Sequence, residues 1–158
     1  MISHSRLLEL MVYDSTTGIF AWRGGRRLRA GKVAGNLMSC GYLRIFADGR
    51  SYMAHRLAWF YITGGWPRAD IDHRNGVRTD NRFANLREAT RAENLQNQRT
   101  AKSTNRTGLL GVQRNRERFM ARIQVDGRQI YLGTFDTPEE AHTIYVAAKR
   151  RLHPGCTI

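Results

Sequence analysis

The sequence predicts an α+β fold, in which short antiparallel strands and a few helices occupy separate stretches of the chain. Short apolar runs are separated by Asn-Gly or Asp-Gly dipeptides, the strongest short-range signal of a β-hairpin, at 48–49, 75–76 and 126–127. The clearest helix-start signals, at Thr90 and Thr137, each come after such a hairpin pattern. Strand patterns grouped ahead of a helix are typical of the α+β class.

The chain is long enough for one ordinary domain or two very small ones, since it has 158 residues. Apolar periodicity stops near Asn97 and resumes after Thr107, and the stretch between them is polar and basic. We therefore expect a first domain over residues 1–96, a linker over 97–107 and a second domain over 108–158.

Residues 1–69 are expected to form a small α+β support for the stretch that follows. A helix, a turn, a strand and a hairpin lead to an apolar helix that Gly64, Gly65 and Pro67 end. The expected helices are 5–11 and 55–63, and the expected strands are 19–22, 42–46 and 51–54.

Composition favours a nucleic-acid partner. The chain carries 26 Lys and Arg residues against 13 Asp and Glu residues, a net charge of +13, and nearly all the cations are Arg. Arg is preferred for bidentate contacts to phosphate and guanine. No apolar run approaches the roughly 18 residues of a transmembrane helix, and residues 1–10 lack the apolar core of a signal peptide. A cytoplasmic protein is therefore expected.

Four polar side chains suggest a site that hydrolyses phosphodiesters. Such a reaction needs an activated water and a cation that neutralises the charge building on the phosphoryl group. His73 has an ordinary pKa near neutrality and is a candidate general base. Asp72 and Asn94 offer hard oxygen ligands, which suit Mg²⁺. Asn85 could hydrogen-bond the backbone or the imidazole and so hold the base.

The local pattern places these residues on two strands and a helix. Residues 71–74 are expected to form a short strand before the Asn-Gly turn, and 84–89 a second strand after a polar loop. Thr90 with Glu93 is a capping box, so a helix begins there. Asn94 would then lie one turn into the helix and point back at the hairpin.

This stretch, with the pattern DHxNGxRxDNRxxNLRxxTRxENxxN, resembles the HNH endonuclease motif. The likeness is to the variant common in phage-encoded and homing-type enzymes, in which Asp replaces the first His and Asn the last. The resemblance implies a ββα-metal fold over about residues 70–98. In it, His73 is the general base and Asn85 orients it, while Asp72 and Asn94 are the metal ligands.

The same resemblance implies hydrolysis of double-stranded DNA with a divalent ion, Mg²⁺ or alternatively Mn²⁺. The products would carry 5′-phosphate and 3′-hydroxyl ends. A single ββα site cuts one strand, so nicking by a monomer is expected, and double-strand cutting would require a weak homodimer or two events. A phage-encoded enzyme would act in the cytoplasm of a bacterial host.

The alternative function is a non-catalytic DNA-binding regulator on a degenerate HNH fold. Asp, Asn and Gly are ordinary turn formers, so each motif residue alone is compatible with a solvated turn. All four positions nevertheless carry functional residue types, which favours the enzyme.

Other residues near the motif are given structural or phosphate-binding interpretations. His55 starts an apolar, aromatic helix, so we expect a buried structural or phosphate-contacting histidine rather than a metal ligand. Asn81 and Arg82 are interpreted as loop-capping and phosphate-contacting residues. Arg74, directly after His73, is also expected to contact DNA.

The two cysteines, Cys40 and Cys156, lie outside any C-x-x-C spacing, so we expect free thiols and no structural zinc. Arg26 and Arg27 belong to a Gly/Arg cluster that is either a solvated face or a clamp on a phosphate backbone. Residues 97–107 are interpreted as a tether or as an extended arm lying on DNA.

The second domain is expected to hold three short strands, 110–114, 118–125 and 129–134, and one helix. Alternation in the middle strand separates a core face from a polar face. The core face has Phe119, Ala121, Ile123 and Val125, and the polar face has Arg118, Met120, Arg122 and Gln124.

The helix begins at Thr137, which is followed by Pro138 and two Glu residues. Its apolar positions are expected to cover the core face, and its last basic residues to complement the helix C-terminus. The apolar positions are Ala141, Ile144, Tyr145, Ala148 and Leu152, and the basic ones are Lys149, Arg150 and Arg151.

This segment resembles the AP2 DNA-binding domain, whose three-stranded sheet packs on one helix and enters the major groove. The likeness rests on GV at 111–112, FMARI at 119–123, YLGTFDTPEEAH at 131–142, Tyr145 and Ala148. It implies DNA-facing side chains at Gln113, Arg118, Met120, Arg122, Gln124, Gln129 and Tyr131. Gln, Glu117 and Tyr partly replace the Arg and Trp residues typical of the plant family, so its sequence preference is not transferred. The alternative is a small module that only packs on the nuclease.

Overall fold

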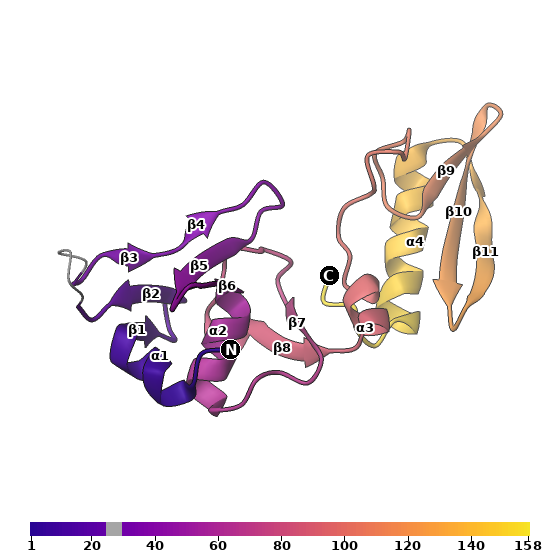
Figure 1. Ribbon diagram of the computed structural model, residues 1–158. Coiled ribbons are helices and arrows are strands. Elements are labelled where there is room, and N and C mark those ends of the chain that lie inside the picture. The colour runs from indigo at the N-terminus through magenta and orange to yellow at the C-terminus, as the bar shows by residue number, and fades with distance from the viewer. Residues whose placement is uncertain (25–29) are drawn as a thin grey trace. The chain divides into compact units, whose positions relative to one another are not determined.

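The computed structural model describes residues 1–24 and 30–158 (Figure 1). These residues form two compact units, 1–89 and 90–158. Four α-helices and several small antiparallel sheets occur in the described residues, which confirms the α+β class. The predicted DNA contacts Arg26 and Arg27 lie outside the described residues.

The described residues of the first unit form three small sheets, ordered β1-β2-β3, β4-β5-β6 and β7-β8. Both predicted helices are present to within one residue. Strand β1 was not expected because its residues fall within the predicted helix and the turn after it, and β3 and β4 were not expected because they have two residues each. Its elements are α1 (His4–Leu10), β1 (Met11–Asp14), β2 (Ile19–Trp22), β3 (Val33–Ala34), β4 (Asn36–Leu37), β5 (Leu43–Ala47), β6 (Arg50–Met53), α2 (Ala54–Thr63), β7 (Asp70–His73), the 3-10 helix η1 (Phe83–Asn85) and β8 (Leu86–Ala89).

Helix α2 lies in the core of the first unit. Leu57 and Ala58 are fully buried, and the Trp59 ring packs on Phe83 of η1 with centroids 5.5 Å apart. Gly64 ends the helix in the left-handed conformation, φ 73°, and donates its N–H to the Phe60 carbonyl. The helix therefore packs against η1, the segment that leads into β8.

The second unit contains one sheet, in the order β11-β10-β9, with helix α4 on one face. The predicted Asp126-Gly127 turn is present, with φ values of 49° and 78°, which suit a type I′ hairpin. Gly111 is required because the Tyr145 ring of α4 lies where a Cβ would stand. The elements are α3 (Arg91–Gln96), β9 (Val112–Asn115), β10 (Arg118–Val125), β11 (Arg128–Phe135) and α4 (Pro138–Leu152).

Both predicted helix starts are confirmed. Thr90 and Glu93 form the reciprocal capping box of α3, and the Thr137 hydroxyl accepts from the Glu140 N–H at the start of α4. Helix α3 is held in the second unit by the C-terminal tail, since the Gly155 N–H donates to Gln96 Oε1 at 3.0 Å.

One predicted role on α4 is wrong: Ile144, expected in the core, is 41% exposed. Lys149 lies in the last turn of the helix as predicted, and it is also buried, with its Nζ donating to the Gln98 carbonyl. At 100° per residue the buried stripe runs through Ala141, Tyr145 and Ala148, and Ile144 and Lys149 lie at its two opposite edges. Hydrophobicity alone therefore did not decide the burial of these two residues.

Residues 97–107 form no helix or strand, and they are fastened to the second unit. Asn105 Nδ2 donates to the carbonyls of Leu109 and Val112 at 3.0 and 3.1 Å, and the Thr107 hydroxyl donates to Val112 at 3.2 Å. We call residues 98–107 the arm. The predicted domain limits at 96 and 108 stay a prediction.

Among the helices that the structure describes, none combines the length and apolarity that crossing a bilayer requires.

Candidate active site

Asp72 and His73 are neighbours on β7, and both are buried. Asp72 pairs with Arg87 across the hairpin, and Arg87 donates to Asp72 Oδ2 from Nε at 3.1 Å and from Nη2 at 2.9 Å. The side chains are 8% and 17% exposed. The buried carboxylate thus has a cationic partner, which offsets the cost of its burial.

His73 is buried, with only 4% of its surface exposed. Its Nε2 lies 3.0 Å from Asn81 Oδ1, and an amide oxygen can only accept, so Nε2 donates and the ring's lone pair is on Nδ1. Burial lowers the pKa of His73, while Asn81, Asp72 and Asp80 act in the opposite direction. The imidazole is therefore neutral at neutral pH, as a general base must be.

Two aromatic side chains flank the His73 ring. The His55 ring packs edge-on against it with centroids 5.2 Å apart, and the Tyr42 ring lies 5.9 Å away. His55 is buried as predicted, and burial, followed by the charges of His73 and Arg56, lowers its pKa to about 3. The guanidinium of Arg78 lies over the Tyr42 ring at 5.1 Å.

Asn85 closes the loop that joins β7 to β8. Its Oδ1 accepts from the Asn75 N–H at 3.0 Å, and its Nδ2 donates to Asn75 Oδ1 and to the Asp80 carbonyl at 3.0 and 2.8 Å. These are backbone and loop contacts, the first of the two possibilities that the sequence left open. The side chain on the imidazole is Asn81, for which the sequence had suggested only loop capping or phosphate contact.

Residues of β1 and of the turn after it contact the backbone of the segment that carries Asn81. The Tyr13 hydroxyl donates to the Asn81 carbonyl at 2.6 Å, and the Phe83 N–H donates to the Ser15 carbonyl at 3.2 Å. Gly18 has φ +76°, and a Cβ there would stand 2.5 Å from Arg82 N and 2.6 Å from Asn81 C. No local signal could have shown this contact, because the residues are more than 60 positions apart in the sequence.

Residues 52–96 match the family model of the HNH endonucleases. The match contains all four motif residues and His55, and it supports an HNH endonuclease and hence a nuclease acting on DNA. Neither the search of curated proteins nor the search of solved structures gave a match to this chain. The sheet of the second unit lies beyond the HNH match, which therefore does not support the resemblance to AP2.

The residues of the HNH match suit a hard cation. Asp72 supplies a carboxylate, and no three His, Cys, Asp or Glu side chains gather as a metal cluster in the described parts of the chain. Mg²⁺ accepts one or two carboxylates and keeps water for the rest of its shell. Asn94 lies on α3, in the second unit, so its predicted approach to Asp72 stays a prediction.

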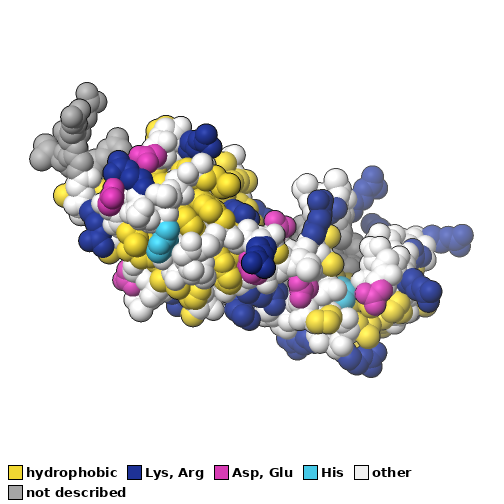
Figure 2. Space-filling view, turned by 60° about the horizontal axis from the view of Figure 1, so that its bottom comes forward, with side chains coloured by type: hydrophobic (Ala, Val, Ile, Leu, Met, Phe, Trp, Pro, Cys, Tyr) yellow, Lys and Arg dark blue, Asp and Glu magenta, His cyan; other side chains and the backbone are white. Residues whose placement is uncertain are grey.

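The arginines predicted to contact DNA near the HNH motif differ in their surroundings. Arg82 donates to both oxygens of Asp80 at 2.7 and 2.6 Å, and this contact is the main cause of the lowered Asp80 pKa, about 2. Arg74 follows β7, and its side chain is exposed. Figure 2 shows Lys and Arg side chains spread over the visible face of the protein.

In the second unit, strand register places every predicted DNA-facing side chain on one face of the sheet. Residues directly opposite in neighbouring strands share a face. Met120 lies opposite Gln113, Arg122 opposite Tyr131, and Gln124 opposite Gln129, while Arg118 alternates with them along β10. This polar face is the one that α4 leaves uncovered, because Val112, Ala121 and Ile123 form the core on the other side.

Proposed function

We propose that this protein is a metal-dependent DNA endonuclease of the HNH type, with His73 as its general base. The observation that carries the proposal is the His73 ring itself, which lies within the HNH match and whose Nε2 donates to Asn81. That bond assigns the ring proton to Nε2 and the basic lone pair to Nδ1. A lowered pKa keeps the ring neutral, so the base is ready at neutral pH.

In the proposed reaction, Nδ1 of His73 removes a proton from a water molecule as its oxygen attacks the phosphorus of the scissile phosphodiester. The new oxygen–phosphorus bond forms while the bond to the 3′ oxygen breaks. The departing 3′ oxygen takes a proton from solvent. The products then carry a 5′-phosphate and a 3′-hydroxyl group.

Asp72 and Asn94 are the side chains proposed to hold the divalent ion, Mg²⁺ or Mn²⁺. When bound, the ion supplies positive charge to the phosphoryl group and the leaving oxygen. Arg87 has a separate role in this scheme: its two bonds to Asp72 Oδ2 fix the rotamer of the carboxylate. Asn85 is proposed to act on His73 indirectly, because its amide closes the loop that positions Asn81.

The second unit is proposed to read duplex DNA through the polar face of its AP2-like sheet. The face presents Arg118, Arg122 and several Gln side chains, which are suited to phosphate and base-edge contacts in the major groove. A single active site on such a reader cuts one strand, so a monomer is expected to nick. Because one chain carries both units, binding of DNA by the second unit raises the local concentration of the site near the bound sequence.

Cleavage of supercoiled plasmid tests the proposal. The purified protein is expected to give nicked product with Mg²⁺ and none with EDTA. His73→Ala should lose at least about a hundredfold in nicking rate, since general-base catalysis contributes roughly that much or more. His4→Ala, a histidine on α1 in the same unit, is the matched control and should cut normally.

A different outcome would favour the regulator. If the wild type binds plasmid but never nicks it with Mg²⁺ or Mn²⁺, the protein is a DNA-binding regulator on an HNH fold. If His73→Ala cuts as fast as the wild type, the assigned base is wrong.

A further inference from the structure

A groove lies within the second unit, between the arm (residues 98–107) and the open edge of the sheet. It has a volume of about 950 Å³ and is lined by arm side chains on one wall and by side chains of β9 and β10 on the other. The hydrogen bonds from Asn105 and Thr107 to the start of β9 hold the arm in place. The groove is therefore a feature of the fold and not a gap beside a free tether.

The lining of the groove is cationic. Lys102 and Arg106 come from the arm, and Arg114 and Arg116 from β9 and the turn after it. No Asp or Glu occurs among the described residues that line it. All four cations are exposed, and none forms an ion pair with a carboxylate in residues 1–24 or 30–158.

Other arginines of the protein contrast with these four. Arg118, just outside the groove, is paired with Asp136 at 2.8 Å, and Arg82 in the first unit is paired with Asp80 at 2.6 Å. The groove cations thus keep their full charge for a ligand. Four like charges around one groove also repel each other, and a bound anion relieves that repulsion.

The shape and chemistry of the lining indicate what kind of anion fits. Small-molecule sites are lined mostly by apolar side chains, whereas only Ala101, Leu110 and Phe119 are apolar here. Cations on both walls suit a linear polyanion that runs along the groove better than a single small ion. Gln113 and Gln124 line the groove and also belong to the polar face of the sheet, so the two surfaces are continuous.

We propose that this groove binds the sugar-phosphate backbone of one DNA strand, beside the bases that the sheet faces. The choice of DNA as the polyanion rests on the proposed function. The groove acts without sequence preference, because phosphate contacts position a protein on DNA and base contacts specify the site. The groove contributes affinity for DNA, and the polar face of the sheet selects the base sequence.

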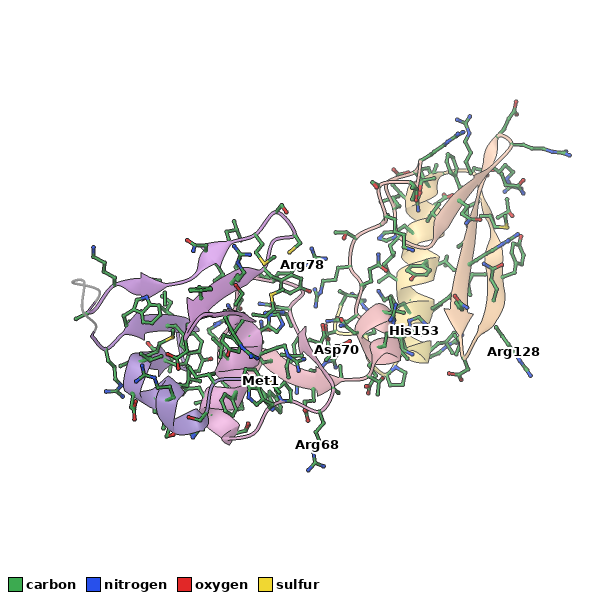
Figure 3. All side chains as sticks on the ribbon, in the orientation of Figure 1. Met1, Arg68, Asp70, Arg78, Arg128 and His153 are labelled. Atoms are coloured by element: carbon green, nitrogen blue, oxygen red, sulfur yellow. The ribbon has the colours of Figure 1, made fainter. Side chains whose placement is uncertain are left out.

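Salt dependence of binding tests the groove, with the full-length protein and a fluorescein-labelled DNA duplex in EDTA, so that binding is separated from cutting. Two groove variants are compared, Lys102→Gln with Arg106→Gln and Arg114→Gln with Arg116→Gln. The matched control is Arg128→Gln with Arg151→Gln, which removes the same charge from the same unit. Figure 3 shows Arg128 extending away from the hairpin, and Arg151 is exposed on the last turn of α4.

Removal of one phosphate-binding cation should reduce the slope of log K against log salt by about 0.9. Each groove variant is therefore expected to lower the slope by about 1.8, and the control to leave it within about 0.3 of the wild type. Equal reductions in groove and control variants would overturn the proposal, because they would report net charge alone. An unchanged slope in both groove variants would overturn it too.

The nicking assay on the same proteins separates this proposal from the proposed function. If the wild type nicks plasmid and the groove variants bind like the control, the groove proposal fails and the nuclease stands. If the wild type never nicks but the groove variants show the reduced slope, the nuclease fails and the groove stands.

Discussion

The loop after His73 and the groove of the second unit use polar side chains in opposite ways. In the loop, Asn81 and Asn85 are buried, and hydrogen bonds hold both in one position. In the groove, Lys102 and Arg114 are exposed and carry no ion pair among the described residues. Fixed amides suit a site that must hold a base in one orientation. Solvated cations suit a surface that must attract a polyanion.

Mutations in these two regions should therefore have different effects. Changes in the loop or its support are expected to alter stability and nicking, because the polar groups there are buried and water cannot replace a missing partner. Changes on the second unit's surface are expected to alter DNA affinity and leave folding alone.

The largest expected effect is at Gly18, in the first unit. Gly18→Ala should lower the free energy of unfolding by about 3–4 kcal/mol, because the new Cβ would collide with the Asn81–Arg82 backbone in addition to the cost of a positive φ. Gly49→Ala is the control: it also has a positive φ, +74°, but nothing lies within 4 Å, so about 1 kcal/mol is expected. Urea denaturation measures both, and equal losses would contradict the proposed support of the loop.

The next effect is a pH dependence that His55 imposes on stability. Its folded pKa of about 3 lies below the ordinary 6.5, so between these values the unfolded chain binds more protons than the folded one. The contribution of His55 therefore leaves the free energy of unfolding unreduced above about pH 6.5. Below that pH the free energy of unfolding decreases, and the loss reaches about 3 kcal/mol at pH 4. His73 and Arg56 face His55 and remain in both proteins compared.

The comparison for His55 is His55→Phe, which keeps a ring beside His73 but cannot titrate. Its unfolding free energy should fall less steeply between pH 7 and pH 4 than that of the wild type. Parallel pH profiles for the two proteins would show that His55 is not the group responsible.

At Asn81 the effect should appear in catalysis. Asn81→Ala removes the acceptor that holds His73 Nε2, so the nicking rate at saturating DNA should fall by about tenfold to a hundredfold with little change in KM. Asn81→Asp retains an oxygen acceptor at that position, so its nicking rate should be more than about a third of the wild-type rate. A loss that Asp fails to rescue, or one that appears only in KM, would assign Asn81 a merely structural role.

The smallest expected effect is at the exposed pair of Arg118 and Asp136, whose side chains are 53% and 80% exposed. Asp136→Asn should change stability by less than about 0.5 kcal/mol. It removes a negative charge beside the polar face and releases Arg118, so DNA affinity should rise by about two- to fivefold. Glu139→Gln, at the start of α4, is the control, and an equal gain there would show that Arg118 has no special part.

Local chemistry was predictable wherever neighbouring residues decide the structure. The capping box at Thr90 and the cap at Thr137 depend on side chains three residues away, and both are present. The Asp-Gly turns at 48–49 and 126–127 need only a positive φ, which their backbones adopt. Strand alternation in β10 correctly separated the core face from the polar face, because its period of two does not depend on distant contacts.

The sequence by itself determined the α+β class, the helix starts and the residue types of the HNH motif, since these rest on local geometry and on the chemistry of the side chains. Only the tertiary structure decided that Asn81 and not Asn85 contacts His73, that Tyr13 and Gly18 hold the loop, and that Lys149 is buried. The tertiary structure alone also showed that the arm lines a groove. Which polar group reaches which partner depends on packing between segments far apart in the chain, and local pattern carries no information about that packing.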